Sequence, residues 1–428
     1  MKESAAFRPC LLCAVLLTVL LALLPAAATT AQTPLTFTWH ASLETIGTLA
    51  STGVGPAIDS QDALSASFQL SHPAGPGLMT YRLSGQASYT PQEISPGSPS
   101  TSALTGYPTT TGITFELPPP RLMGLWLRAS AGRVALDEPT GLLLEDPSAI
   151  YPSQLADGLL VELRFKGLYG SLGAGYLGLL NKQLNRVRFT TQDSVDLADS
   201  SVYFAPPRGL AVLRLEAENL FAGQAFGIEA IGQKDFRGGA STFDSWYLGF
   251  LARGPIASAL RQESALVAAL SVPSDTAAGL GVLVQEKIAW RIPVRYLNET
   301  WFSVLWASSP GGPLEAFPAL AGPTVSDAFP ASLSDIVRLE LGVDAALPAA
   351  PAGAVLSPGF TTRLLLRPSQ EQLPGYTFSL AGPYVGTELE LSAALSPLDG
   401  VRVLARGGVL LAAAAVLPYV RLEAGMGL

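Results

Sequence analysis

Cysteine and histidine are almost absent from this chain of 428 residues. Its two cysteines, Cys10 and Cys13, lie close to the N-terminus, and its two histidines are His40 and His72. Zinc sites need clusters of these residues, and a catalytic triad needs a histidine placed beside a nucleophile. We therefore expect no metal site, no cofactor and no enzymatic activity, and the chain beyond Cys13 cannot form a disulfide.

Long apolar segments are also scarce. Apart from Leu11–Leu24, no segment approaches the roughly 20 apolar residues that a membrane-spanning helix needs. This segment of about 14 residues follows Lys2 and Arg8 and precedes a stretch of small residues, which is the pattern of a secretory signal peptide. We predict that residues 1–31 are removed on export and that residues 32–428 form one domain.

Charge is sparse and slightly acidic. Charged residues make up 14% of the chain, and the formal net charge is −8. Nucleic-acid binding proteins present a basic surface, so we expect no nucleic-acid partner. Apolar residues nevertheless make up 48% of the chain, alongside 42 glycines and 34 prolines. This composition favours many strands and turns over helices.

The apolar residues alternate with polar ones along the chain. In the first segment after the signal, the apolar set is Leu35, Phe37, Trp39, Ala41 and Leu43, and the polar set is Thr36, Thr38, His40, Ser42 and Glu44. Successive side chains of a strand point to opposite faces, so period two predicts one apolar and one polar face. A pattern of this kind over nearly the whole chain is typical of an antiparallel up-and-down transmembrane β-barrel, which meets lipid outside and water inside.

The alternation predicts a set of segments that are mostly long enough to cross a membrane as tilted strands. They are 35–46, 63–72, 78–90, 111–117, 121–133, 158–166, 168–180, 210–219, 223–233, 244–254, 262–272, 279–291, 299–309, 335–347, 359–367, 375–382, 386–396, 400–411 and 417–428. A barrel with both chain ends on one side of the membrane has an even number of strands, so either 111–117 or 375–382 is surplus. We predict about 18 strands, with 16 as the alternative.

The polar faces carry charges of both signs. An Arg or Lys on the lipid face near the middle of the membrane costs about 2–4 kcal/mol, so these charges are predicted to face the lumen. The candidates are His40, Glu44, Glu162, Arg164, Lys166, Arg214, Glu216, Glu218, Arg338, Glu340, Arg402, Arg406, Arg421 and Glu423. A wall of mixed charge suits an aqueous pore, and it can also hold the interior closed through ion pairs.

Long external loops are predicted near residues 47–62, 91–110, 134–157, 181–209 and 310–334, alternating with short turns. Loop 134–157 is notable because it carries several carboxylates, with an arginine at its entrance. Its candidate residues are Arg133, Asp137, Glu138, Glu145, Asp146 and Asp157. Such a loop could narrow the channel and favour cations or calcium, or it could be an ordinary acidic external loop.

The C-terminal strand adds a resemblance to a known class of proteins. Val420, Leu422, Ala424, Met426 and Leu428 alternate with Arg421, Glu423, Gly425 and Gly427. This resembles the last strand of bacterial outer-membrane β-barrel proteins of the porin type, although those usually end in an aromatic residue. The resemblance implies a location in a bacterial outer membrane, reached through the periplasm. It also implies outer-membrane lipid and the barrel-assembly machinery as partners, and it leaves a homo-oligomer open.

The predicted function is a channel for passive diffusion of small solutes or ions. Alternatives are a plugged or ligand-specific transporter, a surface-displayed adhesin or structural barrel, a barrel enzyme that uses His40, and a soluble β-sandwich. A transporter of hydrophobic molecules would need a plug, and the first strand starts too close to the predicted cleavage site to leave room for one at the N-terminus.

Overall fold

The structure is a computed structural model made almost entirely of β-strands. It describes residues 36–52, 55–93, 101–108, 111–117, 124–136, 138, 142–144, 154–177, 208–236, 243–273, 277–294, 296–309, 314–315, 317–318, 334–349, 354–369, 382–398, 401–412 and 416–427. In this part of the chain we find no helix that is long and apolar enough to cross a membrane.

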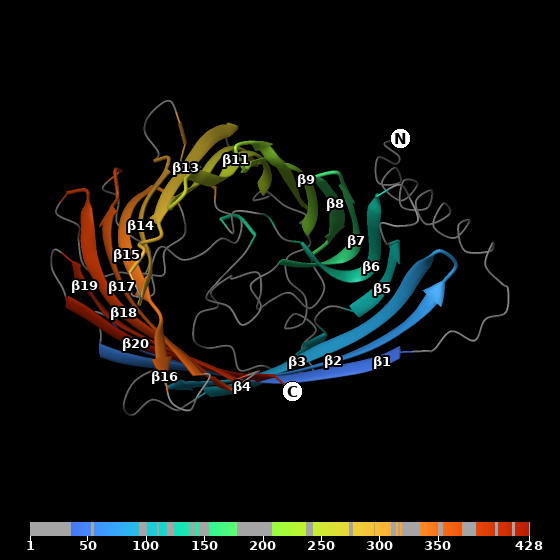
Figure 1. The fold of residues 1–428 in the computed structure, drawn as a ribbon. Helices are drawn as coiled ribbons and strands as arrows, with labels where there is room; N and C mark the ends of the chain where they lie inside the picture. The colour runs from blue at the N-terminus through green and yellow to red at the C-terminus, as the bar shows by residue number, and fades with distance from the viewer. Residues whose placement is uncertain are drawn as a thin grey trace, which may run out of the picture.

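The strands follow one another around a ring (Figure 1). They are β1 (Thr36–Thr52), β2 (Gly55–Ala74), β3 (Gly77–Glu93), β4 (Thr101–Pro108), β5 (Thr111–Leu117), β6 (Trp126–Leu136), β7 (Gln154–Phe165), β8 (Leu168–Tyr176), β9 (Arg208–Phe221), β10 (Gln224–Asp235), β11 (Phe243–Ala257), β12 (Leu260–Pro273), β13 (Gly279–Trp290), β14 (Leu297–Ala307), β15 (Ile336–Ala345), β16 (Leu347–Ala349), β17 (Ala354–Leu366), β18 (Tyr384–Leu398), β19 (Val401–Ala412) and β20 (Val416–Gly427).

The ring is closed and antiparallel throughout. β1 pairs with β2 on one side and with β20 on the other, so the sheet has no free edge there. β4 and β5 pair with successive parts of β3, and β15 and β16 pair with successive parts of β17, so each couple shares one place in the ring. The 20 strands therefore occupy eighteen positions, which confirms the predicted up-and-down barrel of about 18 strands.

Of the two segments suspected as surplus, 111–117 is a strand, since it forms β5. The other, 375–382, falls in the connection between β17 and β18. Its residues 375–381 lie outside the described residues, and Gly382 is in a bend.

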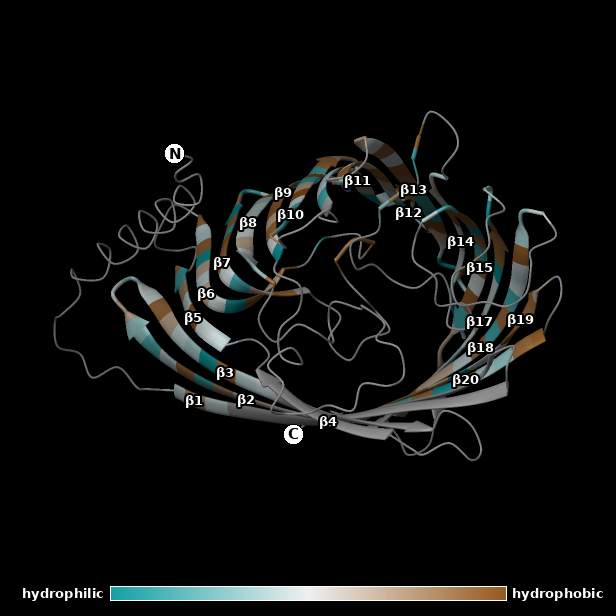
Figure 2. Cartoon of the chain, turned by 180° about the vertical axis from the view of Figure 1, so that it is seen from behind, coloured by the Kyte–Doolittle hydropathy of each residue, from teal (hydrophilic) through white to brown (hydrophobic). Residues whose placement is uncertain are grey.

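The alternating sequence places apolar side chains on the outside of the ring. On β12, Leu266 is 46% exposed, whereas its neighbour Val267 is fully buried on the inner face. Phe250 and Phe302 on nearby strands are likewise nearly half exposed. Figure 2 shows the same alternation as polar and apolar bands along the strands. Because a soluble protein rarely exposes so continuous an apolar surface, this exterior suits contact with lipid.

The two ends of the barrel differ in the length of their connections. At one end, which we call the short-turn rim, β2–β3, β7–β8, β9–β10 and β11–β12 are joined by two residues each. At the other, the long-loop rim, the connections include 137–153, 177–207, 308–335 and 367–383.

Two of the predicted long loops are shorter than expected. Residues 47–52 and 55–62 belong to β1 and β2, and residues 91–93 and 101–108 belong to β3 and β4. The ends of loops 134–157 and 181–209 also belong to strands, and residues 181–207 lie outside the described part.

A row of glycines crosses β5 to β8. Gly112, Gly132, Gly158 and Gly175 are successive cross-strand partners. A Cβ on Gly158 would lie 2.0 Å from the carbonyl oxygen of Ala174, so the backbones approach as only glycine allows. Beyond this row both faces of the β6–β7 hairpin are covered, and Leu136, Leu155 and Ala156 are at most 1% exposed. The end of the hairpin therefore turns into the ring (Figure 1).

Candidate functional site

The inner wall carries a transverse row of alternating charges on β5 to β10. Each member is the cross-strand partner of the next, in the order Glu116, Arg128, Glu162, Ser171, Arg214 and Glu229. Opposite charges on facing strand positions stabilise a sheet, whereas like charges destabilise it. The register of the barrel thus brings together residues that are more than 100 positions apart in the sequence.

Several side chains in and beside this row are in contact. Arg128 Nη1 lies 3.4 Å from Glu162 Oε2, and the Tyr169 hydroxyl donates a hydrogen bond of 3.1 Å to Glu162 Oε1. The indole of Trp126 donates to Glu116 at 2.9 Å. Glu162, a predicted lumen residue, is therefore held from two neighbouring strands.

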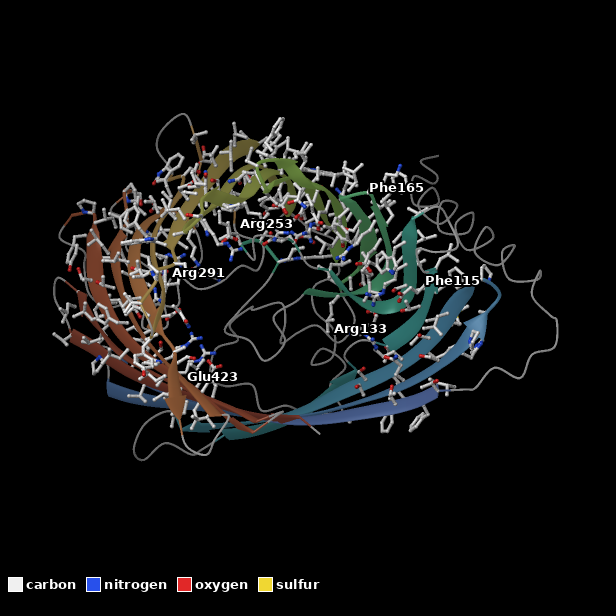
Figure 3. All side chains as sticks on the ribbon, viewed as in Figure 1. Phe115, Arg133, Phe165, Arg253, Arg291 and Glu423 are labelled. Atoms are coloured by element: carbon white, nitrogen blue, oxygen red, sulfur yellow. The ribbon has the colours of Figure 1, made fainter. Side chains whose placement is uncertain are left out.

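Glu216 links the first row to a second one. Glu216 is 6% exposed, and its carboxylate accepts hydrogen bonds from Arg214, at 2.5 Å, and from Arg253 on β11. Figure 3 shows Arg253 on the inner side of the strands, whereas Phe115 and Phe165 lie on the outer side.

The second row continues from β11 to β18. Its members are Arg253, Glu263, Lys287, Ser303, Glu340, Arg363 and Glu388, again as successive cross-strand partners. The signs alternate along this row as well. Together the two rows make a girdle of alternating charge around most of the inner wall.

Arg363 is the centre of the most buried part of the girdle. Its Nε lies 2.8 Å from Glu340 Oε2, and its Nη1 lies 3.3 Å from carboxylate oxygens of both Glu388 and Glu390. Glu388 is fully buried and Glu390 is 5% exposed. One guanidinium thus contacts three carboxylates, and Arg338, 4.0 Å from Glu340, is a second cation in the cluster.

Two aromatic side chains complete this cluster. The Tyr419 hydroxyl on β20 lies 2.7 Å from Glu388 Oε1 and 2.5 Å from Glu390 Oε2. The indole of Trp301 donates to Glu340 Oε1 at 2.9 Å. The buried carboxylates therefore have neutral partners as well as cations, which compensates for their loss of water.

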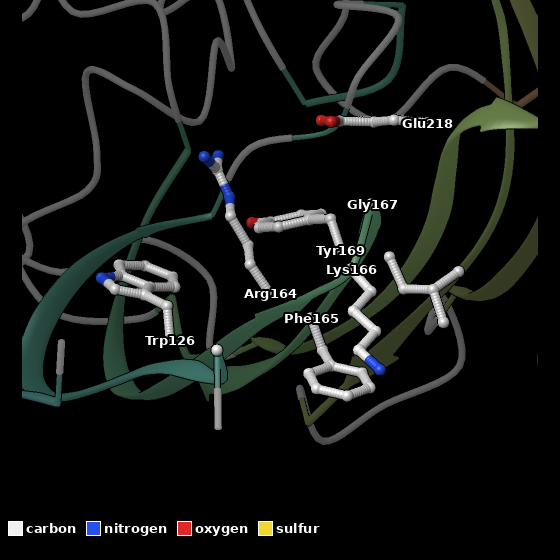
Figure 4. Close-up of a pocket in the computed structure, with 9 residues that line it drawn as sticks. Trp126, Arg164, Phe165, Lys166, Gly167, Tyr169 and Glu218 are labelled. Atoms are coloured by element: carbon white, nitrogen blue, oxygen red, sulfur yellow. The ribbon is translucent and has the colours of Figure 1, made fainter. Parts of the chain in front are cut away.

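A cavity of about 300 Å³ lies beside the short-turn rim (Figure 4). Arg164 is exposed there, with its Cζ 5.6 Å from the ring centre of Trp126 and 5.1 Å from that of Tyr169. Glu218, also exposed, lines the same cavity. The two rings hold the guanidinium by cation–π attraction while its charge stays accessible.

The placement of Lys166 among the lumen residues is wrong. Lys166 lies in the β7–β8 turn with φ 48°, and its ammonium lies over the ring of Phe165, which is on the outer side. Figure 4 shows Arg164 and Lys166 on opposite sides of the hairpin. The turn interrupts the two-residue period on which the prediction depended.

The remaining wall candidates lie on the last strands and on β1. Arg421 is 6% exposed, with its Nε 2.7 Å from Glu423 Oε1. Arg406 is the cross-strand partner of Arg421 and is partly buried. The backbones of His40 and Glu44 lie in β1 and that of Arg402 in β19, but these three side chains lie outside the described part.

The candidates around loop 134–157 do not assemble into a carboxylate cluster in the part that the structure describes. Arg133 and Asp157 are strand residues whose side chains form an ion pair of 3.2 Å. Glu138 is 2% exposed and accepts a hydrogen bond from the amide of Leu143. Asp137, Glu145 and Asp146 lie outside the described residues. Within the described ranges, no three His, Cys, Asp or Glu residues are grouped so as to hold a metal ion.

An apolar layer lies inside the barrel towards the long-loop rim. Leu142–Leu144 and Phe317, from two different connections, are at most 3% exposed and share one buried cluster with inward-facing residues of the wall. Tyr247 packs against the Phe317 ring and donates a hydrogen bond of 2.5 Å to the carbonyl of Pro318. Pieces of these connections are therefore anchored inside the ring.

The candidate set lacks residues that the wall cluster depends on. Arg363 and Tyr419 occupy inward positions, and the same alternation that selects Glu340 also selects Arg363. The sequence does not identify Tyr419 in this way, because aromatic residues near strand ends are also common on the lipid-facing side.

The barrel resembles solved structures from Pseudomonas aeruginosa. OpdL has 14% sequence identity and a TM-score of 0.55, covering 92% of this chain and 98% of its own. OccK5 (OpdH) has 14% identity and a TM-score of 0.54, covering 91% and 98%. The outer membrane protein OprD has 10% identity and a TM-score of 0.55, covering 92% and 93%. At these identities the similarity shows the fold alone. No family model and no curated protein matches the sequence.

Proposed function

We propose that this chain is an outer-membrane channel through which small solutes or ions diffuse passively. The observation that carries the proposal is a closed barrel of eighteen strand positions with an apolar exterior and a charged inner wall. Barrels of 16–18 strands enclose an aqueous channel. The shared fold with OprD, itself an outer membrane protein, supports the location.

The arrangement of the charges bears on selectivity. Most charges that the structure describes on the wall are engaged with partners of opposite sign, which weakens the field that each of them exerts in the lumen. Arg164 is different, because it is exposed and, in the part of the chain that the structure describes, held only by aromatic rings. We assign to it a direct role in meeting anions that pass the short-turn rim.

Export and orientation follow from the same proposal. Residues 1–31 act as the signal, the short-turn rim faces the periplasm, and the long loops face outward. N-terminal sequencing of the protein purified from outer membranes should begin at Gln32. An N-terminus at Met1 would show that the signal is retained.

The test of channel activity is single-channel recording of the purified chain in a planar lipid bilayer. Discrete and reproducible current steps are expected, and a salt gradient across the bilayer gives the charge preference from the reversal potential. A barrel that is folded, as judged by heat-modifiable electrophoretic mobility, but produces no steps would contradict the proposal.

A second candidate, a barrel closed by its own loops and opened by a ligand, is favoured by the buried Leu142–Leu144 and Phe317. In that case the unmodified protein is silent, and replacement of Leu142–Leu144 by glycines releases the loop and produces current. Equal step sizes before and after the replacement would reject this candidate.

A further inference from the structure

One carboxylate lies on the apolar outer face of the barrel. Glu286 on β13 has the same orientation as Val284 and Ile288, which are 37% and 39% exposed, whereas Leu283 on the inner face is fully buried. The pairings of β13 with β12 and β14 show no register shift, so Glu286 points outward.

The position of Glu286 along the barrel is unusual for a charged group. Trp290, an exposed aromatic residue at the short-turn rim, is four residues away, which is about 13 Å along the strand. The apolar band of an outer-membrane barrel is about 25 Å tall, so Glu286 lies within it. Away from the rims, it is the one Asp, Glu, Lys or Arg residue that we find at outward positions with described side chains.

Two polar residues of β12 lie near Glu286 on the same outer face. Ser264 is its cross-strand partner, and Gln262 Nε2 donates a hydrogen bond of 2.7 Å to Ser264 Oγ. We call Gln262, Ser264 and Glu286 the polar patch. Within the described part of the chain, Glu286 itself has no hydrogen bond or ion pair.

The polar patch contains both hydrogen-bond donors and a hydrogen-bond acceptor. The Gln262 amide has a second N–H, and the Ser264 hydroxyl has its own hydrogen, so both can donate. The Glu286 carboxylate can only accept when it is ionised. Lipid tails offer neither donors nor acceptors, whereas a second patch facing the first in the opposite sense offers both.

The side chains around the patch are small enough for close approach. Ala252 is the outward-facing partner of Ser264, and Ala268 lies four residues along β12 on the same face. Small residues of this kind allow membrane-embedded surfaces to pack tightly, and polar side chains between them hydrogen-bond across the contact.

We propose that the polar patch is the centre of an interface between two copies of this chain, packed side by side about a two-fold axis. In such an interface the same surface serves both partners, and donors from one patch meet the carboxylate of the other. The inference rests on the membrane location proposed above and is independent of channel activity.

The first test is disulfide cross-linking of Ser264→Cys in native membranes. The parent chain has cysteine only at positions 10 and 13, inside the predicted signal, so the parent serves as the negative control for cross-linking. Mild oxidation should convert most of the variant to a covalent dimer. Leu391→Cys, at a 65% exposed outer position on β18, is the matched control and should stay monomeric.

The second test is the mass of the detergent-solubilised protein by light scattering. The parent, Glu286→Gln and the outer-face control Val284→Leu should be dimers, and Glu286→Leu should be a monomer, because leucine suits a lipid-facing position but cannot accept a hydrogen bond. A monomeric parent, or Ser264→Cys cross-linking no more than Leu391→Cys, would overturn the proposal. So would a cross-linked product with the mass of a different protein. None of these measurements depends on current, so their failure is distinct from failure of the channel proposal.

Discussion

Tyr419 on β20 lies directly over Gly408 on β19. A methyl group on Gly408 would come within 2.6 Å of Tyr419 Cε1, so only glycine at this position leaves room for the ring. This is how the Tyr419 hydroxyl crosses an entire strand to reach Glu388 and Glu390 on β18.

The first prediction concerns this crossing. Gly408→Ala should displace the Tyr419 ring and break its hydrogen bonds to the buried carboxylates, which lowers the free energy of unfolding by about 1–3 kcal/mol. Urea unfolding followed by heat-modifiable mobility measures the change. Gly407→Ala is the control, since a methyl group there has no neighbour closer than 3.9 Å. If the two variants lowered the free energy of unfolding equally, the Tyr419 ring over Gly408 would not have the stabilising role that we assign to it.

The second prediction concerns the cation at the centre of the cluster. Arg363→Met leaves Glu340, Glu388 and Glu390 without their shared guanidinium and should cost about 3–5 kcal/mol of stability. Arg261→Met, at an exposed position on β12, should change stability by no more than about 0.5 kcal/mol. The same unfolding assay tests both, and a stable Arg363→Met variant would show that the carboxylates do not need this partner.

The third prediction concerns ion selectivity. Arg164→Gln removes an exposed positive charge beside the short-turn rim, so the reversal potential in a salt gradient should shift towards cation preference. Lys166→Gln removes the same charge two residues away, but this ammonium lies over the Phe165 ring on the outer side of the turn, so the reversal potential should shift less. Shifts of equal size would indicate that passing ions do not distinguish the two sides of this hairpin.

The fourth prediction concerns the glycine row across β5 to β8. Gly158→Ala forces a methyl group against the carbonyl oxygen of Ala174 and should destabilise the barrel by about 1–3 kcal/mol. At Gly170 on β8 the nearest atoms are leucine side-chain carbons at 3.4 Å, so Gly170→Ala should be tolerated. The temperature at which each purified variant loses its folded mobility decides between them.

The alternation in the sequence predicts strands well wherever one face meets lipid. Leu389 and Leu391 against Glu388 and Glu390 is a clear example, and the structure places the two pairs on opposite faces of β18. The prediction fails where the alternation fades although the strand continues. In the β1–β2 hairpin, Thr48, Asp59 and Gln61 are strand residues, but the sequence around them is rich in Thr, Ser, Gly and Pro and has the composition of a loop.

The candidate site is predictable in part for the same reason. The two-residue period of a strand gives the face on which each charged residue lies, but it does not identify the partner of that residue on another strand. Glu216 and Arg253 are 37 residues apart, and their contact depends on the exact register between β9, β10 and β11. A turn also escapes the rule, as Lys166 shows, because its left-handed backbone redirects the side chain.

The alternating charges of the inner wall also help to set the register between neighbouring strands when the barrel closes. Sliding a strand by one residue exchanges its lipid and water faces, which the apolar pattern forbids, but sliding it by two residues preserves both faces. The charges can distinguish the correct register from a two-residue slip, which the apolar pattern cannot do. A two-residue slip that replaces Glu162 with Arg164 opposite Arg128, or Glu263 with Arg261 opposite Arg253, sets two arginines against each other. The girdle therefore disfavours these two-residue misalignments during assembly.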